Sequence, residues 1–265
     1  MSNVLKGPDL IATGLAVARS ACDVARGHGA QAGVLTGSFA RGDAHPRSDI
    51  DLHFIGDGPA YELSRENELL VSASWSSAAD HRASFRDPRR AGAAVPAWRA
   101  ALILFDPDGI AATLQREAVA WSWDDIGAGA LDGWVVEQIA GFAEEVHKLV
   151  AAIERGRVTM AAVQRSVLAL RLAAVMSVNC RLLYDTENQL WDLVSAALGG
   201  SWASAQARAL GLRGESFEET CLAALELYCL ADAACPSSGT RSQRDVISHA
   251  RTLAERAINR SSRRP

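Results

Sequence analysis

Two aspartates near the start of the chain alternate with apolar residues, in a pattern that a β-strand would normally avoid. Asp49 and Asp51 flank Ile50 in the run "SDIDLHFIG". In a strand, side chains at i and i+2 share a face, so both carboxylates point the same way while Ile50 and Leu52 point into the opposite layer. Charge inside a β-run costs stability unless something cationic meets it. The pattern therefore predicts a ligand at these carboxylates.

The expected ligand is a divalent cation. When two carboxylates lie a few ångströms apart, their repulsion raises the pKa of one of them, unless a cation keeps both ionised. Oxygen ligands suit Mg²⁺, which usually completes its octahedron with water and substrate phosphates. Asp49 and Asp51 are therefore assigned as metal ligands and catalytic residues, and a phosphate-bearing substrate is expected beside them.

The segment before the aspartates offers groups that suit those phosphates. Gly37 would let the backbone approach phosphate oxygens, and Ser38 offers a hydroxyl and an amide directly after the apolar run "AGVLT". Arg41 and Arg47 are close enough in sequence to add positive charge, although either can instead be solvated. The residues expected to bind the phosphate-bearing substrate here are Gly37, Ser38, Arg41 and Ser48.

Composition narrows the class of protein. The chain has 265 residues, of which 49% are hydrophobic, so it can bury the core of one large domain or two ordinary ones. A net charge of -4 argues against a protein that binds the phosphate backbone of nucleic acids non-specifically, so no nucleic acid partner is expected. The five cysteines lack metal-ligand spacing and predict reduced thiols. No signal peptide and no uncharged apolar run of about 18 residues is evident, which predicts a cytoplasmic protein without a membrane partner.

Periodicity predicts an α+β protein in two parts. A small mixed-sheet domain is expected over residues 1–130, and an all-α helical bundle over residues 131–265. The glycine-rich run "IGAGALDG" is interpreted as the joint, and the basic tail 251–265 as a frayed end. The first part should contain a helix and four strands, at 9–27, 32–37, 49–56, 68–75 and 99–109.

The stretch "GSFARGDAHPRSDIDL", residues 37–52, resembles the signature of the polymerase-beta-like nucleotidyltransferase superfamily. There, Gly-Ser is followed after a loop by Asp-x-Asp on the next strand. The wider layout looks like the antibiotic nucleotidyltransferases that adenylylate aminoglycosides or lincosamides. The resemblance implies that Ser38 contacts the terminal phosphates of the nucleotide and that Asp49 and Asp51 bind Mg²⁺. It also implies transfer of a nucleoside monophosphate, AMP from ATP, to a hydroxyl group with release of pyrophosphate.

Many members of that superfamily carry a third carboxylate on the strand beside Asp-x-Asp. Here the corresponding run "ELLVSASW" offers Ser72 and Ser74 instead. Glu68 shares their strand face but would stand about 13–20 Å away at the usual strand rise. Asp106 is a second candidate, although its sequence "DPDG" is also typical of a turn.

A pair in the helical part is a third candidate. Glu144 and Lys148 stand four residues apart in "AGFAEEVHKLV" and share a helix face. The resemblance implies a base glutamate and a phosphate-contacting lysine at this spacing, on the first helix after the α/β domain. Glu144 is therefore assigned as a catalytic residue and Lys148 as a nucleotide contact, with an exposed ion pair as the alternative. His53, on the strand face of Asp51, is left open between a substrate contact and a structural histidine.

The sequence leaves three functions open. The leading one is a Mg²⁺-dependent enzyme that moves AMP from ATP to a hydroxyl of a small molecule, for which an antibiotic is a candidate. The alternatives are a protein nucleotidylylating enzyme of a toxin-antitoxin type system and a catalytically silent nucleotide-binding regulatory module. The expected partners are the NTP and the small-molecule acceptor, and a homodimer is left open.

Overall fold

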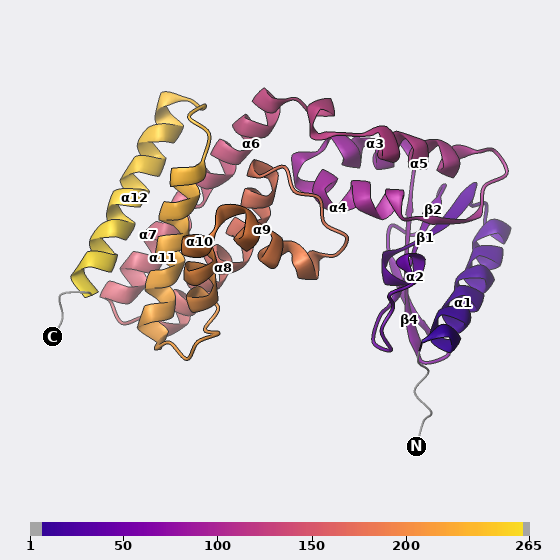
Figure 1. Cartoon of the computed structure of the whole chain (residues 1–265), viewed down its shortest axis with the longest axis horizontal. Helices are drawn as coiled ribbons and strands as arrows, with labels where there is room; N and C mark the ends of the chain where they lie inside the picture. The colour runs from indigo at the N-terminus through magenta and orange to yellow at the C-terminus, as the bar shows by residue number, and fades with distance from the viewer. Residues whose placement is uncertain (1–6, 262–265) are drawn as a thin grey trace, which may run out of the picture. The chain divides into compact units, whose positions relative to one another are not determined.

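The structure is a computed structural model that describes residues 7–261. The chain divides into two compact units, Met1–Asp125 and Ile126–Pro265 (Figure 1). The first is built on a mixed sheet, and the second is helical throughout its described residues, so the expected α+β class is confirmed. The helix α6 (Ala128–Gly141) runs through the division expected after residue 130, and the glycine-rich joint is therefore partly helical.

A five-stranded sheet forms the centre of the first unit. Its order is β3-β4-β2-β1-β5, with β1 antiparallel to β2 and β5, β3 antiparallel to β4, and β2 parallel to β4. The edge strand β3 is an addition to the four strands expected. The strands are β1 (Ala32–Thr36), β2 (Ile50–Ile55), β3 (Glu62–Glu66), β4 (Leu69–Ser76) and β5 (Leu102–Phe105).

One face of this sheet carries the hydrophobic core of the unit. The helix α1 (Pro8–Gly27) lies along it (Figure 1). The apolar residues of β2 that alternate with the acids point into this layer, as the strand pattern predicts. The buried cluster includes Leu10, Val17, Leu35, Phe39, Ile50, Leu52, Phe54 and Val71.

The opposite face carries Asp51, and three helices that pack against one another lie beside the sheet, α3 (Ala78–Arg86), α4 (Pro88–Arg99) and α5 (Ile110–Ala120). Each starts with a carboxylate that accepts free backbone N–H groups. Asp80 completes a capping box at α3, Asp87 accepts from the first turn of α4, and Asp106 accepts from the first turn of α5. A 3-10 turn, η1 (Trp123–Asp125), follows α5.

The second unit packs its helices around α8, which contacts α6, α7, α9 and α11. By length and composition alone α8 could cross a membrane, although it carries two arginines and also fits the core helix of a helical unit. The expected frayed tail is ordered up to residue 261 as part of α12; residues 262–265 lie outside the described part. The remaining elements are α7 (Ala143–Glu154), α8 (Val158–Asn179), η2 (Glu187–Gln189), α9 (Leu190–Leu198), α10 (Gly200–Ala209), α11 (Phe217–Ala234) and α12 (Arg241–Ser261).

Candidate active site

The turn from β1 into α2 (Gly37–Arg41) brings the backbone against the side chain of Asp51. Thr36, the last residue of β1, pairs with Asp51 in the antiparallel register. Gly37 follows with φ +66°, and a Cβ there would lie 2.3 Å from Oδ2 of Asp51. Because only glycine has no Cβ, only glycine lets this carboxylate lie so close to the turn. The two halves of the motif singled out in the sequence therefore meet in space.

Replacing Gly37 by Ala tests this close approach. We expect Gly37→Ala to lose roughly 1–2 kcal/mol of stability from its left-handed backbone and also to displace the Asp51 carboxylate. The matched control is Gly42→Ala, because Gly42 has φ +82° but nothing within 4 Å of its would-be Cβ. Calorimetric titration with Mg²⁺ and ATP should show weaker binding for Gly37→Ala alone. Equal affinities in the two variants would contradict the assignment.

The two aspartates differ in environment. Asp49 lies just before β2 and is exposed, whereas Asp51 is partly buried. Burial raises the pKa of Asp51 to about 6, with a further contribution from the charge of Asp49, while Arg41 acts in the opposite direction. A cation held by both carboxylates would offset the burial and the repulsion together.

This donor set fits Mg²⁺, because carboxylate oxygens are the hard ligands that the ion prefers. Residues 7–261 contain no group of three or more His, Cys, Asp or Glu side chains that could hold a metal. Asp49 and Asp51 alone would fill only part of the oxygen shell of such an ion, which suits an ion that also binds substrate phosphates.

The other residues expected to contact the nucleotide lie around the same turn. Ser38 is the second residue of α2, and Arg41 lies in its last turn, where its guanidinium is 3.3 Å from a carboxylate oxygen of Asp43. Ser48 lies on the loop that returns to β2, and its Oγ accepts a hydrogen bond from the backbone N–H of His45 at 3.0 Å. The hydroxyl of Ser48 thus stabilises the loop that delivers the aspartates to the strand.

No carboxylate stands beside Asp51 on the neighbouring strand. Ser72 of β4 is its register partner. Glu68 lies in the turn before β4 with φ +67° and pairs with Arg65. Asp106 follows β5, beyond β1 on the other side, and accepts two backbone N–H groups of α5 at 3.1 and 2.9 Å. Neither Glu68 nor Asp106 therefore supplies a third carboxylate beside Asp51.

Two groups of hydrogen bonds on the strand face of Asp51 escaped the sequence analysis. Nδ1 of His53 lies 2.6 Å from Oγ of Ser74, and Nε2 of His81 lies 2.9 Å from Oγ of Ser76. The indole N–H of Trp98 donates to Nδ1 of His81 at 3.2 Å. Because an indole N–H can only donate, His81 must carry its proton on Nε2 and is neutral. The feature of the sequence that could have indicated these bonds is the spacing of Ser72, Ser74 and Ser76, which places their hydroxyls on one strand face.

This network makes His53 a structural residue in its own unit. Burial lowers its pKa, and its ring meets that of His81 edge-on at 5.9 Å between centroids. Burial also lowers the pKa of His81 to about 4, and the proximity of His53 and Arg90 acts in the same direction. Two neutral imidazoles therefore support the strand face next to Asp51.

We expect stability to fall as the pH drops from 6.5 to 4, because His81 binds a proton more readily in the unfolded chain than in the folded one. A shift from 6.5 to about 4 corresponds to roughly 3 kcal/mol. Denaturant unfolding at several pH values should show a shallower loss for His81→Gln, whereas exposed His28→Gln should follow the parent. Superimposable pH curves for His81→Gln and the parent would contradict the neutral buried His81.

The pair assigned in the helical unit lies on α7. Nζ of Lys148 is 2.7 Å from Oε1 of Glu144, and the two side chains are 39% and 71% exposed. The hydrogen bond from Lys148 lowers the pKa of Glu144, and Glu144 raises that of Lys148. Glu144 also lines a groove with residues of α12, where the rings of His147 and His249 stack at 5.1 Å. Its carboxylate is ionised and accessible, as both a base and a surface ion pair require.

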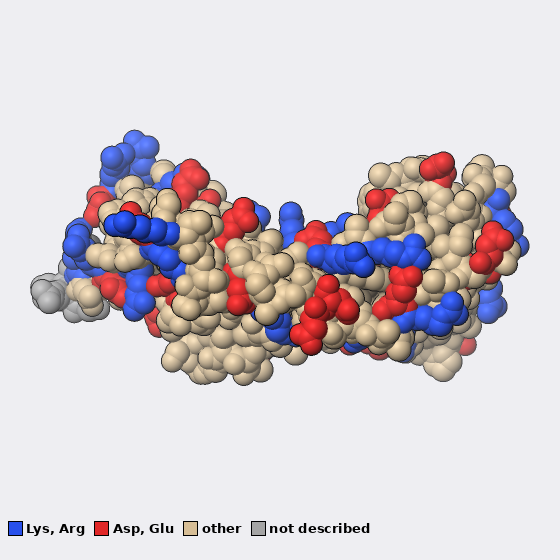
Figure 2. Space-filling view, turned by 90° about the horizontal axis from the view of Figure 1, so that it is seen from above, with Lys and Arg blue, Asp and Glu red and all other residues tan. Residues whose placement is uncertain are grey.

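Charged side chains are mixed over the face shown in Figure 2, where blue basic and red acidic groups stand side by side on both units. This face is therefore neither wholly basic nor wholly acidic on either unit.

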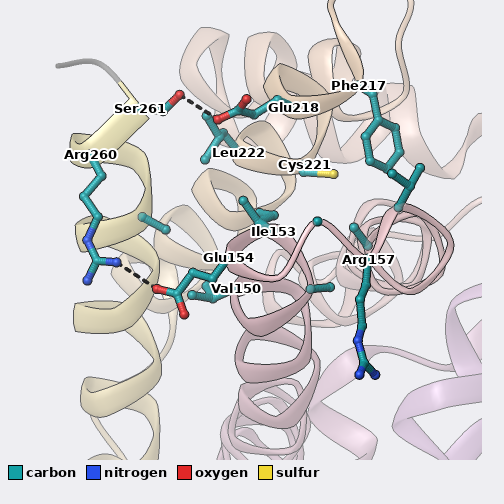
Figure 3. Close-up of a pocket in the computed structure, with 15 residues that line it drawn as sticks. Val150, Ile153, Glu154, Arg157, Phe217, Glu218, Cys221, Leu222, Arg260 and Ser261 are labelled. Carbon is teal, nitrogen blue, oxygen red and sulfur yellow. Dashed lines mark hydrogen bonds and ion pairs between the residues drawn. The ribbon is translucent and has the colours of Figure 1, made fainter. Parts of the chain in front are cut away.

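A cavity of about 240 Å³ lies within the helical unit (Figure 3). Apolar side chains such as Ile153 and Leu222 line it. At its rim, Arg260 pairs with Glu154 at 2.7 Å, and the Ser261 hydroxyl donates to Glu218 at 3.1 Å. The carboxylates of Glu154 and Glu218 are thus both bonded to the last turn of α12. Because these carboxylates are already bonded, they give the cavity no preference for a cation or an anion.

Comparison with known proteins agrees with this geometry. Residues 28–83 match the family model of the nucleotidyltransferase domain, a range that contains β1, α2, β2 and the aspartates. In fold, the chain is similar to the crystal structure of a nucleotidyltransferase-like protein from Exiguobacterium sibiricum 255-15. The TM-score is 0.52 at 12% identity, over 91% of this chain and 88% of the other. No curated protein matches the chain.

The match supports the superfamily inferred from Gly-Ser and Asp-x-Asp, and nucleotidyl transfer as the general activity. The structural likeness concerns the fold. The finer resemblance to antibiotic nucleotidyltransferases stays a prediction.

Proposed function

We propose that the protein transfers AMP from ATP to a hydroxyl group of a small molecule, with Mg²⁺ and release of pyrophosphate. The acceptor oxygen forms a bond to the α-phosphorus, the bond from that phosphorus to the bridging oxygen breaks, and the hydroxyl proton passes to a base. The observation that carries the proposal is the contact between the Gly37 turn and the Asp51 carboxylate, which joins a phosphate-binding turn to a metal ligand.

In this proposal, Asp49 and Asp51 hold Mg²⁺, which would neutralise phosphate charge and orient the α-phosphate. The backbone at Gly37 and the hydroxyl of Ser38 bind the terminal phosphates. Arg41 adds positive charge from the last turn of α2. Ser48 keeps the aspartate loop in place and borders the nucleotide.

The helical unit contributes the base. Glu144 accepts the proton of the acceptor hydroxyl, and Lys148 turns from Glu144 to the phosphates when the nucleotide binds. The support for this assignment is indirect: Ser72 occupies the register position beside Asp51 where a third acid would lie, and Glu144 is ionised and accessible.

The test is a transfer assay with ATP labelled at the α-phosphate. A panel of hydroxylated small molecules, beginning with aminoglycosides and lincosamides, is incubated with enzyme and Mg²⁺, and products are examined by mass spectrometry for an added AMP. Pyrophosphate release that depends on the acceptor supports the proposal.

The five free cysteines fit the reducing cytoplasm, which is the location we propose.

The same assay separates the alternatives. Label found on protein rather than on small molecules would support a protein nucleotidylylating enzyme. Tight ATP binding without pyrophosphate release, for every acceptor tried, would favour the silent module, whose structural support is Ser72 opposite Asp51.

A further inference from the structure

The sheet face that carries Asp51 continues to the edge strand β3, whose residues are all exposed. In the register, Asp51 of β2 lies opposite Ser72 of β4, and Ser72 lies opposite Leu63 of β3. Paired residues share a face, so these three side chains form one row. Adjacent strands are about 4.8 Å apart, which places Leu63 roughly 10 Å from Asp51.

Large apolar side chains gather at the end of this row. Leu63 is 54% exposed and Leu70, two residues before Ser72 on β4, is 48% exposed. Tyr61, two residues before Leu63, is 61% exposed. By strand alternation Leu63 and Leu70 share the face of Asp51, and Tyr61 lies one residue before β3. We call Tyr61, Leu63 and Leu70 the β3–β4 platform.

The pattern of β3 shows that this face has an apolar character of its own. On the opposite face, β3 presents Glu62, Ser64 and Glu66, which are exposed and polar. Leu63, the apolar residue of β3, instead lies on the face of Asp51 as a diagonal neighbour of Leu70, and adjoining exposed apolar side chains of this kind can mark a binding surface. The cation on the platform side, Arg65, already pairs with Glu68. No acid of β3 or β4 lies on this face, and Glu68, in the turn between the two strands, already pairs with Arg65, so the platform itself offers a cationic ligand no unpaired carboxylate.

The reaction geometry indicates what the platform binds. Gly37 approaches Asp51 from the β1 side, and Ser72 lies on the β4 side. In an in-line displacement, the attacking and leaving oxygens lie on opposite sides of the phosphorus. If the Gly37 turn binds the leaving pyrophosphate, the acceptor hydroxyl approaches from the β4 side. The body of the acceptor then extends over the row that ends at Leu63.

We propose that the β3–β4 platform is the acceptor subsite and selects an amphipathic alcohol, a molecule with a reactive hydroxyl on an apolar body, over a polycation. This inference rests on the proposed function, because the in-line argument assumes nucleotidyl transfer. Leu63 and Leu70 determine specificity by packing against the apolar body, while the polar row of Ser72 and Asp51 meets the hydroxyl.

The test uses n-alkyl β-D-glucosides as probes, below the concentration at which they form micelles. Calorimetric affinity should rise about tenfold from the butyl to the octyl glucoside, as expected if four added methylenes are each about half buried. Leu63→Ser and Leu70→Ser should each abolish most of this dependence on chain length. Leu212→Ser is the matched control, since Leu212 is an exposed leucine of the helical unit. In the parent protein with ¹³C-labelled leucine methyls, octyl glucoside should shift the NMR signals of Leu63 and Leu70.

Binding of the glucosides is measured without nucleotide, and binding of Mg²⁺ and ATP is measured separately in every variant. A parent protein that binds no ATP refutes the proposed function, whereas affinity that is independent of chain length, or unchanged in Leu63→Ser, refutes the platform. A dimer that Leu63→Ser converts to a monomer, with no glucoside binding in the parent, would make the platform a contact between copies and also overturn the proposal.

Discussion

Asp51→Asn should reduce nucleotidyl transfer by about 10³-fold or more, since a metal in such a site supplies several kcal/mol of transition-state stabilisation. Asp49→Asn should cause a comparable loss, because each variant removes one of two protein ligands. The measurement is the turnover of labelled ATP at saturating acceptor, with exposed Asp57→Asn as the control that changes charge but leaves the pair intact.

The same substitution should make the protein more stable at neutral pH. The pKa of Asp51 is raised to about 6 in the folded protein, against about 3.9 in an unfolded chain. The folded state therefore holds the proton more tightly, and ionisation of Asp51 costs stability above pH 6. After allowance for solvent screening, Asp51→Asn should gain on the order of 1 kcal/mol at pH 7.5. The gain should shrink as the pH falls through 6 towards 4.

Thermal melts with and without Mg²⁺ and ATP check this assignment. The parent should be stabilised by the ligands, and Asp51→Asn should not. Normal turnover in Asp51→Asn would overturn the metal site. A variant that is both inactive and less stable at neutral pH would instead show that Asp51 serves the fold.

Glu144→Gln should reduce turnover by about 10²–10⁴-fold, the usual contribution of a general base. Glutamine keeps the shape of the side chain but cannot accept the hydroxyl proton. Affinity for ATP should change little, whereas Lys148→Ala should weaken ATP binding as well as turnover. Because the pair is exposed, its loss should leave the melting temperature almost unchanged.

The matched control is Glu145→Gln, which makes the same change of charge one residue further along α7. Pre-steady-state measurement of pyrophosphate release would separate the chemical step from binding. Turnover equal to the parent in Glu144→Gln would leave Glu144 and Lys148 as an ordinary surface ion pair, and the base would then have to come from elsewhere.

Local patterns in the sequence were enough to predict the central part of the site. The alternation of Ile50, Asp51 and Leu52 correctly predicted that the apolar residues of β2 lie on its core face and Asp51 on the opposite face. The glycine and serine after the first apolar run correctly marked the turn that meets Asp51. These predictions succeed because side-chain alternation and the need for glycine depend on a few neighbouring residues.

What the sequence could not supply depends on pairing between distant segments. The bond from Trp98 to His81 joins two helices, and neither residue carries a local signal of the other. The strand β3 has no buried residue, so its sequence resembles a loop until β4 pairs with it. The sequence also did not show that the glycine-rich joint is partly helical, because Gly129 and Gly133 lie within α6, where packing outweighs their poor helix propensity.

The β1–β2 pairing also has a consequence for the order in which the protein is made. Gly37 and Asp51 are 14 residues apart and join through adjacent antiparallel strands, so the loop that must close between them is short. All of the first unit leaves the ribosome before the helices of the second unit, and domains generally fold as they emerge. We therefore expect the Gly37 turn and the aspartates to assemble on the nascent chain before the second unit is complete.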